Sequence, residues 1–290
     1  MDFAKYLHPT YGEVQAPIDP PIKNTGVFIG QKSTDYVAGK VGGLNYEIVN
    51  PEGDWRPYVV LGEPQSFPNF DSFGCTGFAN NNTAEIQLKF YTGHEFNFSD
   101  EAINYLADCS PTGNYVYKPA DWARKNGRIL QESWTIVNPP SWIEYHKPVP
   151  QDVQSKSIKF NESYEWVDTS RTSLDFHLKQ APLLLIIGAG SFNHNVVAVK
   201  ANNTGIWYFD SYDPWLKVTT QTPLSALKLI VKPMSNTQFV KKAGTQEYGF
   251  YVPALSEDAL KDKAMNFGKP EIVNPEGTID FSQAKEISGL

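Results

Sequence analysis

The stretch FDSFGCTGFANNNTAEIQ, residues 70–87, places Cys75 directly after a Phe-Gly turn and at the start of a segment with helical character. A free cysteine is most often a small buried hydrophobic residue. At a helix N-terminus, however, the positive end of the helix dipole favours the thiolate. The other cysteine of the chain, Cys109, follows NYLAD at the end of a second expected helix without a basic neighbour, and we expect it to be inert. Cys75 is therefore the candidate nucleophile.

A nucleophilic thiol needs a base, and His194 is the candidate among the five histidines of the chain. His194 opens the expected strand HNVVAVKA, and Asp210 ends the next one, GIWYFDSY. Two antiparallel strands joined by a short hairpin bring the start of one close to the end of the other. A carboxylate there would fix the imidazole tautomer and stabilise the imidazolium. Because each signal alone is weak, the hypothesis depends on the ordered set of cysteine, histidine and aspartate.

Helical patterns from about residue 75 to 145 would carry the thiol. A helix starting at Cys75 is expected to close at Gly93, and Ser99 is a suitable N-cap for DEAINYLAD. Pro119 is expected at the first position of a helix that contains ADWARKN, with Gly127 just past its end. These signals predict a helical region in the first half of the chain.

Strand patterns from about residue 156 to 235 would carry the base. They are SIKFN, YEWVD, LLLII, NVVAVKA, GIWYFDS and LKLIVK, with ANNTG as a hairpin connection. The segment 1–60 is rich in Pro, Gly and Tyr and predicts an extended arm, and a short helix is expected after Ser256.

Composition narrows the functional classes. The formal net charge of −7 argues against a nucleic-acid or anionic-membrane partner. The longest apolar run, APLLLIIGAG, is too short to span a bilayer, and the start of the chain lacks the pattern of a secretory signal. Two cysteines make no disulfide framework, so a reducing compartment is expected. No metal-ligand spacing and no nucleotide-binding glycine pattern is present, so we expect no metal and no cofactor.

These motifs carry a resemblance that spans roughly residues 60–220. The segments NFDSFGCTGFANNNTAEIQLKFYTG, FNFSDEAINYLADCS and ADWARKNGRILQESW resemble the helical lobe of papain-like cysteine peptidases, and NHNVVAV with GIWYFDSY resembles their His and Asn-Ser-Trp strands. With GDWRPYVVLGEPQ ahead of FDSFGC, the pattern is most similar to papain-like proteins of tailed bacteriophages. The resemblance implies an α+β, two-lobe fold with N- and C-terminal extensions.

The implied organisation has three parts. Residues 1–60 form an extended arm or pro-like segment, residues 61–235 the papain-like domain, and residues 236–290 a C-terminal extension. Within the domain, a helical lobe covers about 70–145 and a sheet lobe about 146–235.

The resemblance also implies roles for single residues. Cys75 takes the position of the nucleophile and His194 that of the base, while Asp210 stands where the family has an orienting Asn. A carboxylate there is expected to raise the pKa of the imidazolium. The oxyanion-stabilising amide is assigned to Gln65, ten residues before the nucleophile, with Asn69 as the alternative.

Two further positions differ from the family pattern. Ser72 occupies the place of the loop cysteine, so the family disulfide to the position of Cys109 cannot form. Trp215 is expected to line the cleft or to shield the His-Asp pair from water, with plain core packing as its other role.

The function implied is hydrolysis of peptide or isopeptide bonds through a Cys75 thioester, by a phage-encoded thiol peptidase. The alternatives are a transglutaminase-like or peptidoglycan-cleaving amidase or endopeptidase, and a virion structural protein with reduced or no activity. The expected partners are a peptide or protein substrate and phage structural proteins, with no nucleic acid and no membrane. The expected location is the host cytoplasm during infection, or the virion.

Overall fold

The computed structural model describes residues 3–8, 12–17, 47–68, 70–110, 112–137, 139, 141–189, 192–212, 216–233, 238–241 and 248–251. The chain divides into two compact units, Met1–Lys232 and Pro233–Leu290. The described part of the second unit is a hairpin of β11 (Gln238–Lys241) and β12 (Tyr248–Tyr251). The short helix expected after Ser256 lies outside the described residues.

The first unit combines helices with mainly antiparallel strands, which confirms the α+β class. Its helices are α1 (Cys75–Thr92), α2 (Asp100–Leu106), α3 (Tyr117–Asn126), α4 (Trp142–Tyr145), α5 (Gln151–Gln154) and α6 (Arg171–Leu178), with short 3-10 turns η2 (Arg56–Tyr58) and η3 (Gln131–Ser133). Its strands are β1 (Phe3–His8), β2 (Gly12–Pro17), β3 (Ser66–Phe67), β4 (Phe70–Asp71), β5 (Asn161–Val167), β6 (Leu183–Ala189), β7 (Phe192–Asn202), β8 (Gly205–Phe209), β9 (Leu216–Thr219) and β10 (Ser225–Lys232).

The larger sheet of the first unit has the order β5-β10-β6-β7-β8-β9, and every pairing in it is antiparallel. Strands β7 and β8 form the expected hairpin, closed at Asn202 opposite Gly205. The expectation that SIKFN is a strand was wrong, since Ile158 makes only an isolated bridge with Arg128. The segment follows α5 and pairs with the chain leaving α3, so the sheet ladder begins only at β5.

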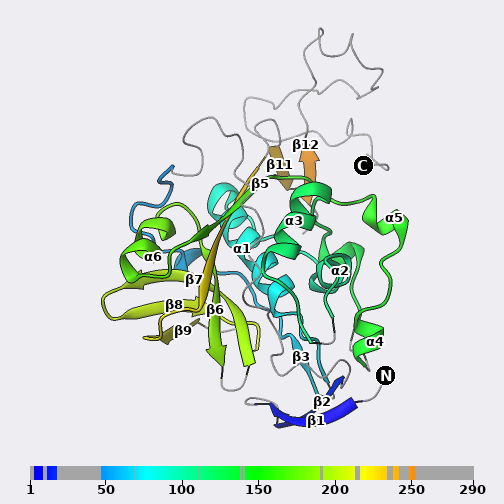
Figure 1. Cartoon of the computed structure of the whole chain (residues 1–290). Helices are drawn as coiled ribbons and strands as arrows, with labels where there is room; N and C mark the ends of the chain where they lie inside the picture. Colours follow the sequence, from blue (N-terminus) through cyan, green and yellow to red (C-terminus); the bar gives the residue numbers. More distant parts are fainter. Residues whose placement is uncertain are drawn as a thin grey trace, which may run out of the picture. The chain divides into compact units, whose positions relative to one another are not determined.

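Helix α1 is the central helix of the first unit and lies between the larger sheet and helices α2 and α3 (Figure 1). It is buried from Cys75 through Leu88, although Asn80, Asn81 and Asn82 follow one another in its second turn. Asparagine is a poor helix former, so tertiary contacts must stabilise this turn. The expected stop is present, because Gly93 caps the helix with a left-handed φ of 72°.

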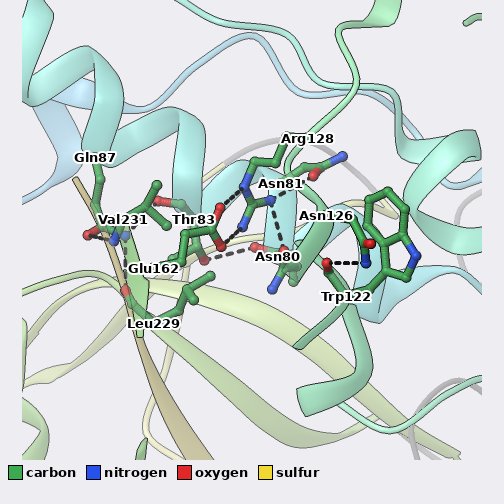
Figure 2. A network of polar contacts seen from close by, with 11 residues as sticks. Asn80, Asn81, Thr83, Gln87, Trp122, Asn126, Arg128, Glu162, Leu229 and Val231 are labelled. Atoms are coloured by element: carbon green, nitrogen blue, oxygen red, sulfur yellow. Dashed lines mark hydrogen bonds and ion pairs between the residues drawn. The ribbon is translucent and has the colours of Figure 1, made fainter. Parts of the chain in front are cut away.

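The asparagine turn is held by a buried arginine (Figure 2). Arg128 Nη1 donates to Asn80 Oδ1 at 2.8 Å and to Asn81 Oδ1 at 2.9 Å. Its Nε and Nη2 donate to the two carboxylate oxygens of Glu162 on β5, both at 2.9 Å. A paired and hydrogen-bonded ion pair can be buried without leaving an unsatisfied charge. The contacts therefore tie α1 to the edge strand of the larger sheet.

Gln87 makes the second polar link from α1 to this sheet (Figure 2). Its Nε2 donates to the carbonyl of Leu229 at 3.0 Å, and its Oε1 accepts from the backbone N–H of Val231 at 3.0 Å. Both partners belong to β10, so the helix that begins with the candidate nucleophile is fixed to two neighbouring strands.

The other helix signals are partly confirmed. Ser99 caps α2 by accepting from the backbone N–H of Ala102 at 3.1 Å, and Gly127 follows α3 directly. The expectation that Pro119 is the first residue of its helix was wrong, because α3 begins at Tyr117. The first N–H groups of a helix have no intrahelical partner, so proline is also tolerated at the third position. Helix α6, capped by Ser170, lies within the strand-rich region and was not expected.

A smaller sheet, of order β1-β2-β4-β3, contains the strands that lead to the candidate nucleophile. The hairpin β3–β4 ends four residues before Cys75, and β2 pairs with β4 in parallel, with Gln15 opposite Phe70. Part of the expected N-terminal arm is therefore a β-hairpin that extends this sheet. None of the helices within the described ranges is long and apolar enough to cross a membrane.

Candidate active site

Cys75 is the first residue of α1 and has no solvent-exposed surface. Its N-cap, Gly74, offers no side chain to the first helical turn, so the N–H groups near the thiol are not occupied by a capping side chain. A Cβ at Gly74 or Gly77 would come within 2.2 Å of the Asn104 side chain on α2. The two glycines thus allow α2 to pack closely against the start of α1.

The turn before Cys75 has a strained backbone held by side chains. Phe73 has a φ of 54°, in the left-handed region, and its N–H donates to Asp71 Oδ1 at 2.7 Å. The carbonyl of Ser72 accepts from Trp142 Nε1 at 3.1 Å and lies 3.0 Å from His146 Nε2. An aromatic cluster packs around this turn: Phe67, Phe70, Phe73, Phe78, Trp142 and Tyr145. The position of the thiol therefore follows from a fixed loop as well as from the helix.

His194 and Asp210 lie together where β7 begins and β8 ends. His194 Nε2 is 2.7 Å from Asp210 Oδ1, and the same oxygen accepts from the backbone N–H of Tyr212 at 2.9 Å. Burial of His194 lowers its pKa, but the hydrogen bond to Asp210 and the interaction with Cys75 raise it, and the result is a pKa of about 9. Burial raises the pKa of Asp210. Its hydrogen bond to His194, the charge of that ring and the hydrogen bond to Lys217 outweigh this effect, so the pKa of Asp210 lies well below its usual range.

The remaining ring nitrogen of His194 is available for the thiol. Nδ1 is buried and has no hydrogen-bond partner of ordinary geometry. Cys75 is nevertheless close enough to be one of the causes that raise the pKa of His194. Catalytic hydrogen bonds are often long before substrate binds. The ring therefore binds the carboxylate through Nε2, which leaves Nδ1 as its candidate nitrogen for the thiol.

Tyr212 covers the His194 ring and was missed as a site residue by the sequence analysis. Its ring centroid is 4.5 Å from that of His194, with the planes tilted by 32°, and Tyr212 is buried. Trp215, the expected shielding residue, lies outside the described residues. The signal for Tyr212 was present, because Asp-Ser-Tyr stands in the same order as the Asn-Ser-Trp of the resembled family.

Gln65 is close to the turn of Cys75 in spite of its distance in sequence. The hairpin β3–β4 folds out between them, so the N–H of Ser72 donates to the carbonyl of Gln65 at 3.2 Å. The Gln65 amide is buried, with Oε1 accepting from Ser211 Oγ at 2.6 Å and Nε2 donating to Asp71 Oδ1 at 3.2 Å. An amide nitrogen has two hydrogens, so one remains for another acceptor. The alternative residue, Asn69, lies outside the described residues.

Cys109 differs from Cys75 in its surroundings. Both cysteines are free thiols. Cys109 Sγ donates to the carbonyl of Phe73 at 3.4 Å. Burial, with smaller effects from Cys75 and from nearby carboxylates, raises the pKa of Cys109 well above its usual value. This thiol is therefore held in its protonated form.

Lys217 is a second residue that the sequence analysis missed. It lies on β9 opposite Tyr208, and its Nζ is 2.8 Å from Asp210 Oδ2. No group of three or more His, Cys, Asp or Glu side chains in the described ranges could hold a metal ion.

Comparisons with known proteins give low similarity. No family model matches the chain, and no curated protein matches it. A recombinant stem bromelain precursor is 14% identical with a TM-score of 0.48, covering 63% of this chain and 70% of that one. Digestive procathepsin L 3 of the Tenebrio molitor larval midgut is 17% identical with a TM-score of 0.47, covering 71% and 76%. The Carica candamarcensis cysteine protease CMS1MS2, in complex with E-64, is 16% identical with a TM-score of 0.44, covering 62% and 97%.

These structures do not connect the chain with tailed bacteriophages. Because the TM-scores are below 0.5, any chemistry assigned to this chain must come from the geometry of its own site.

Proposed function

We propose that this protein is a thiol peptidase that hydrolyses peptide bonds through a thioester on Cys75. The observation that carries the proposal is the arrangement of three buried side chains. Cys75 begins α1, His194 interacts with it, and the second nitrogen of the His194 ring lies 2.7 Å from Asp210. A thiol paired with an oriented imidazole is the usual arrangement of a cysteine nucleophile.

In the proposed mechanism, the proton of the thiol rests on His194 Nδ1 before the reaction. A His194 pKa of about 9 keeps the ring protonated at neutral pH, and Asp210 stabilises that charge through Nε2. The thiolate attacks the scissile carbonyl, and the imidazolium then protonates the leaving amine. Water attacks the thioester with neutral His194 as base, which returns the acid product and the free thiol.

The negative charge that develops on the carbonyl oxygen needs donors. The N–H of Cys75 stands at the positive end of α1, and the second hydrogen of the Gln65 amide is the side-chain candidate. The bond from Ser211 to Gln65 Oε1 keeps the amide nitrogen on the side of the Cys75 turn, where Asp71 accepts from it.

The proposal extends to the setting implied by the resembled proteins. An isopeptide bond is an amide and would react by the same steps. In the phage setting, the substrates would be peptides or proteins, including phage structural proteins, in the host cytoplasm or in the virion. No cofactor takes part in these steps.

The test is turnover of a peptide library by the wild type, Cys75→Ala and Cys109→Ala. We expect the wild type and the Cys109 variant to cleave, and the Cys75 variant to lose at least about 10³-fold in rate, since the nucleophile is absent. Its thermal unfolding should stay close to that of the wild type. Muropeptide cleavage without peptide cleavage would replace the proposal by the amidase alternative. Folded wild type without turnover of either substrate, especially as a stoichiometric part of purified particles, would favour the structural alternative.

A further inference from the structure

The carboxylate of Asp210 is shared between two cationic partners. Its Oδ1 accepts from His194 Nε2 at 2.7 Å, and its Oδ2 accepts from Lys217 Nζ at 2.8 Å. The side chain of Asp210 is 7% exposed and that of Lys217 is 33% exposed. The antiparallel register of β8 and β9 sets Lys217 opposite Tyr208, two residues before Asp210. The lysine therefore binds the carboxylate oxygen that the imidazole does not use.

Lys217 compensates the extra negative charge that Asp210 brings to the site. With a neutral amide at position 210, a thiolate and an imidazolium would form a balanced pair. Asp210 adds a negative charge, and three buried charges with an excess of one are costly to remove from water. The ammonium of Lys217 restores the balance, and its partial exposure keeps the cost of its own desolvation small.

We propose that Lys217 is a positioning residue that balances the charge of Asp210 and thereby sets the pH range over which His194 is protonated. Its meaning for catalysis rests on the proposed function. The coupling between Lys217 and His194 through Asp210 is a property of the folded protein and does not depend on turnover.

Several described groups lie around this pair. Asp210, Cys75 and the ring of Tyr212 face His194. On the outer side, Tyr208 is close to both Asp210 and Lys217: burial and Asp210 raise its pKa, and Lys217 lowers it. Removal of the lysine charge leaves the carboxylate free to stabilise the imidazolium more strongly. The pKa of His194 should therefore rise when Lys217 is neutralised.

The experiment is an NMR titration of the His194 ring in full-length protein, assigned by the signal lost in His194→Gln. Lys217→Met should raise the pKa of His194 by about half a unit or more, the size expected for a partly exposed charge one carboxylate away. Lys217→Arg should keep the wild-type value. The matched control is Lys125→Met, which removes an exposed lysine from its pair with Asp121 on α3.

A second pair of variants tests whether Lys217 acts through Asp210. In the Asp210→Asn background, the carboxylate that links Lys217 to the His194 ring is absent, so Lys217→Met should shift the pKa of His194 by much less than in the wild-type background. Equal shifts in both backgrounds, or no shift with Asp210 present, would overturn the proposal. If Lys217→Met does not fold, Lys217→Gln removes the same charge with a polar head and is judged by the same criteria.

The same variants separate this proposal from the proposed function. The basic limb of the rate against pH should move upward in Lys217→Met together with the pKa of His194. A shift of that pKa in a protein without peptidase turnover would leave the charge coupling intact and remove the proposed function. If the wild type turns over peptide but Lys217→Met leaves the pKa of His194 unchanged, the proposed function stands and the charge coupling is removed.

Discussion

Gln65 and Ser211 are joined by two hydrogen bonds that connect the loop of the nucleophile to the end of β8. The N–H of Gln65 donates to the carbonyl of Ser211 at 2.8 Å, and Ser211 Oγ donates to Gln65 Oε1 at 2.6 Å. Ser211 directly follows Asp210 in the chain. The candidate oxyanion donor is therefore fixed by the same strand end that carries the carboxylate partner of His194.

Gln65→Ala should lower the turnover of a peptide substrate by about 10²-fold, because one oxyanion donor is lost. Alkylation of Cys75 forms no oxyanion, so its rate should change little. Steady-state kinetics and the alkylation rate are measured on the same preparation. The control is Gln221→Ala, at an exposed glutamine after β9. Turnover within about twofold of the wild type would contradict the assignment of Gln65.

Tyr212 offers a test of the aromatic cover over His194. Tyr212→Ala should admit water to the His194–Asp210 hydrogen bond and lower turnover by about tenfold or more, since such a bond is stronger in a water-excluded site. Tyr212→Phe keeps the ring that lies 4.5 Å from the imidazole and should retain most of the activity. An alanine variant as active as the phenylalanine variant would show that the ring has no such role.

The buried ion pair of Arg128 and Glu162 should matter for stability. Arg128→Met leaves the Glu162 carboxylate buried without its partner, and we expect a loss of ~3–5 kcal/mol in the free energy of unfolding. The double variant with Glu162→Leu removes both charges and should recover a large part of that loss. Urea unfolding of the two variants and the wild type measures the difference. Equal losses in both would mean that the cost comes from packing and from Asn80 and Asn81.

Because the His146 ring is buried, we expect the folded protein to lose stability in acid. Burial lowers its pKa from the ordinary 6.5 to about 4, with the Ser72 carbonyl opposing the shift. The folded protein then binds fewer protons than the unfolded chain between these values, so stability present above pH 6.5 is lost as the pH falls towards 4. A shift of this size corresponds to a contribution of about 3 kcal/mol.

The contribution of His146 is isolated by comparison with His146→Gln. The unfolding free energy of the wild type should fall more steeply than that of the variant between pH 6.5 and 4, in urea titrations at several pH values. Parallel curves would mean that this ring is not held neutral by burial.

Local sequence signals predicted the helix and strand elements that carry the site. The glycine after α1, the serine cap of α2 and the Asn-Asn-Thr-Gly hairpin each act within a few residues, so they are readable without the fold. The two antiparallel strands also made His194 and Asp210 expected neighbours. Helix α6 was not predicted because its eight residues lie among strands and carry only a short amphipathic pattern.

The parts that the sequence did not reveal depend on contacts between distant segments. Lys217 reaches Asp210 only through the pairing of β9 with β8, and β9 has a weak strand signal. Gln65 is brought to Ser72 by a hairpin whose strands have two residues each. Arg128 is separated by 47 residues from Asn81, and nothing in either local pattern indicates their contact.

The reactivity of the two cysteines tests the central claim most directly. If exposure alone set the labelling rate, Cys109, which is 8% exposed, would react faster than Cys75, which has no exposed surface. We expect the opposite order: iodoacetamide at neutral pH should label Cys75 about 10²-fold faster than Cys109, and His194→Gln should remove most of that advantage. Peptide mass spectrometry over time gives both rates in one sample. Equal slow labelling of the two thiols, or fast labelling of Cys75 that does not depend on His194, would contradict an activated nucleophile at the start of α1.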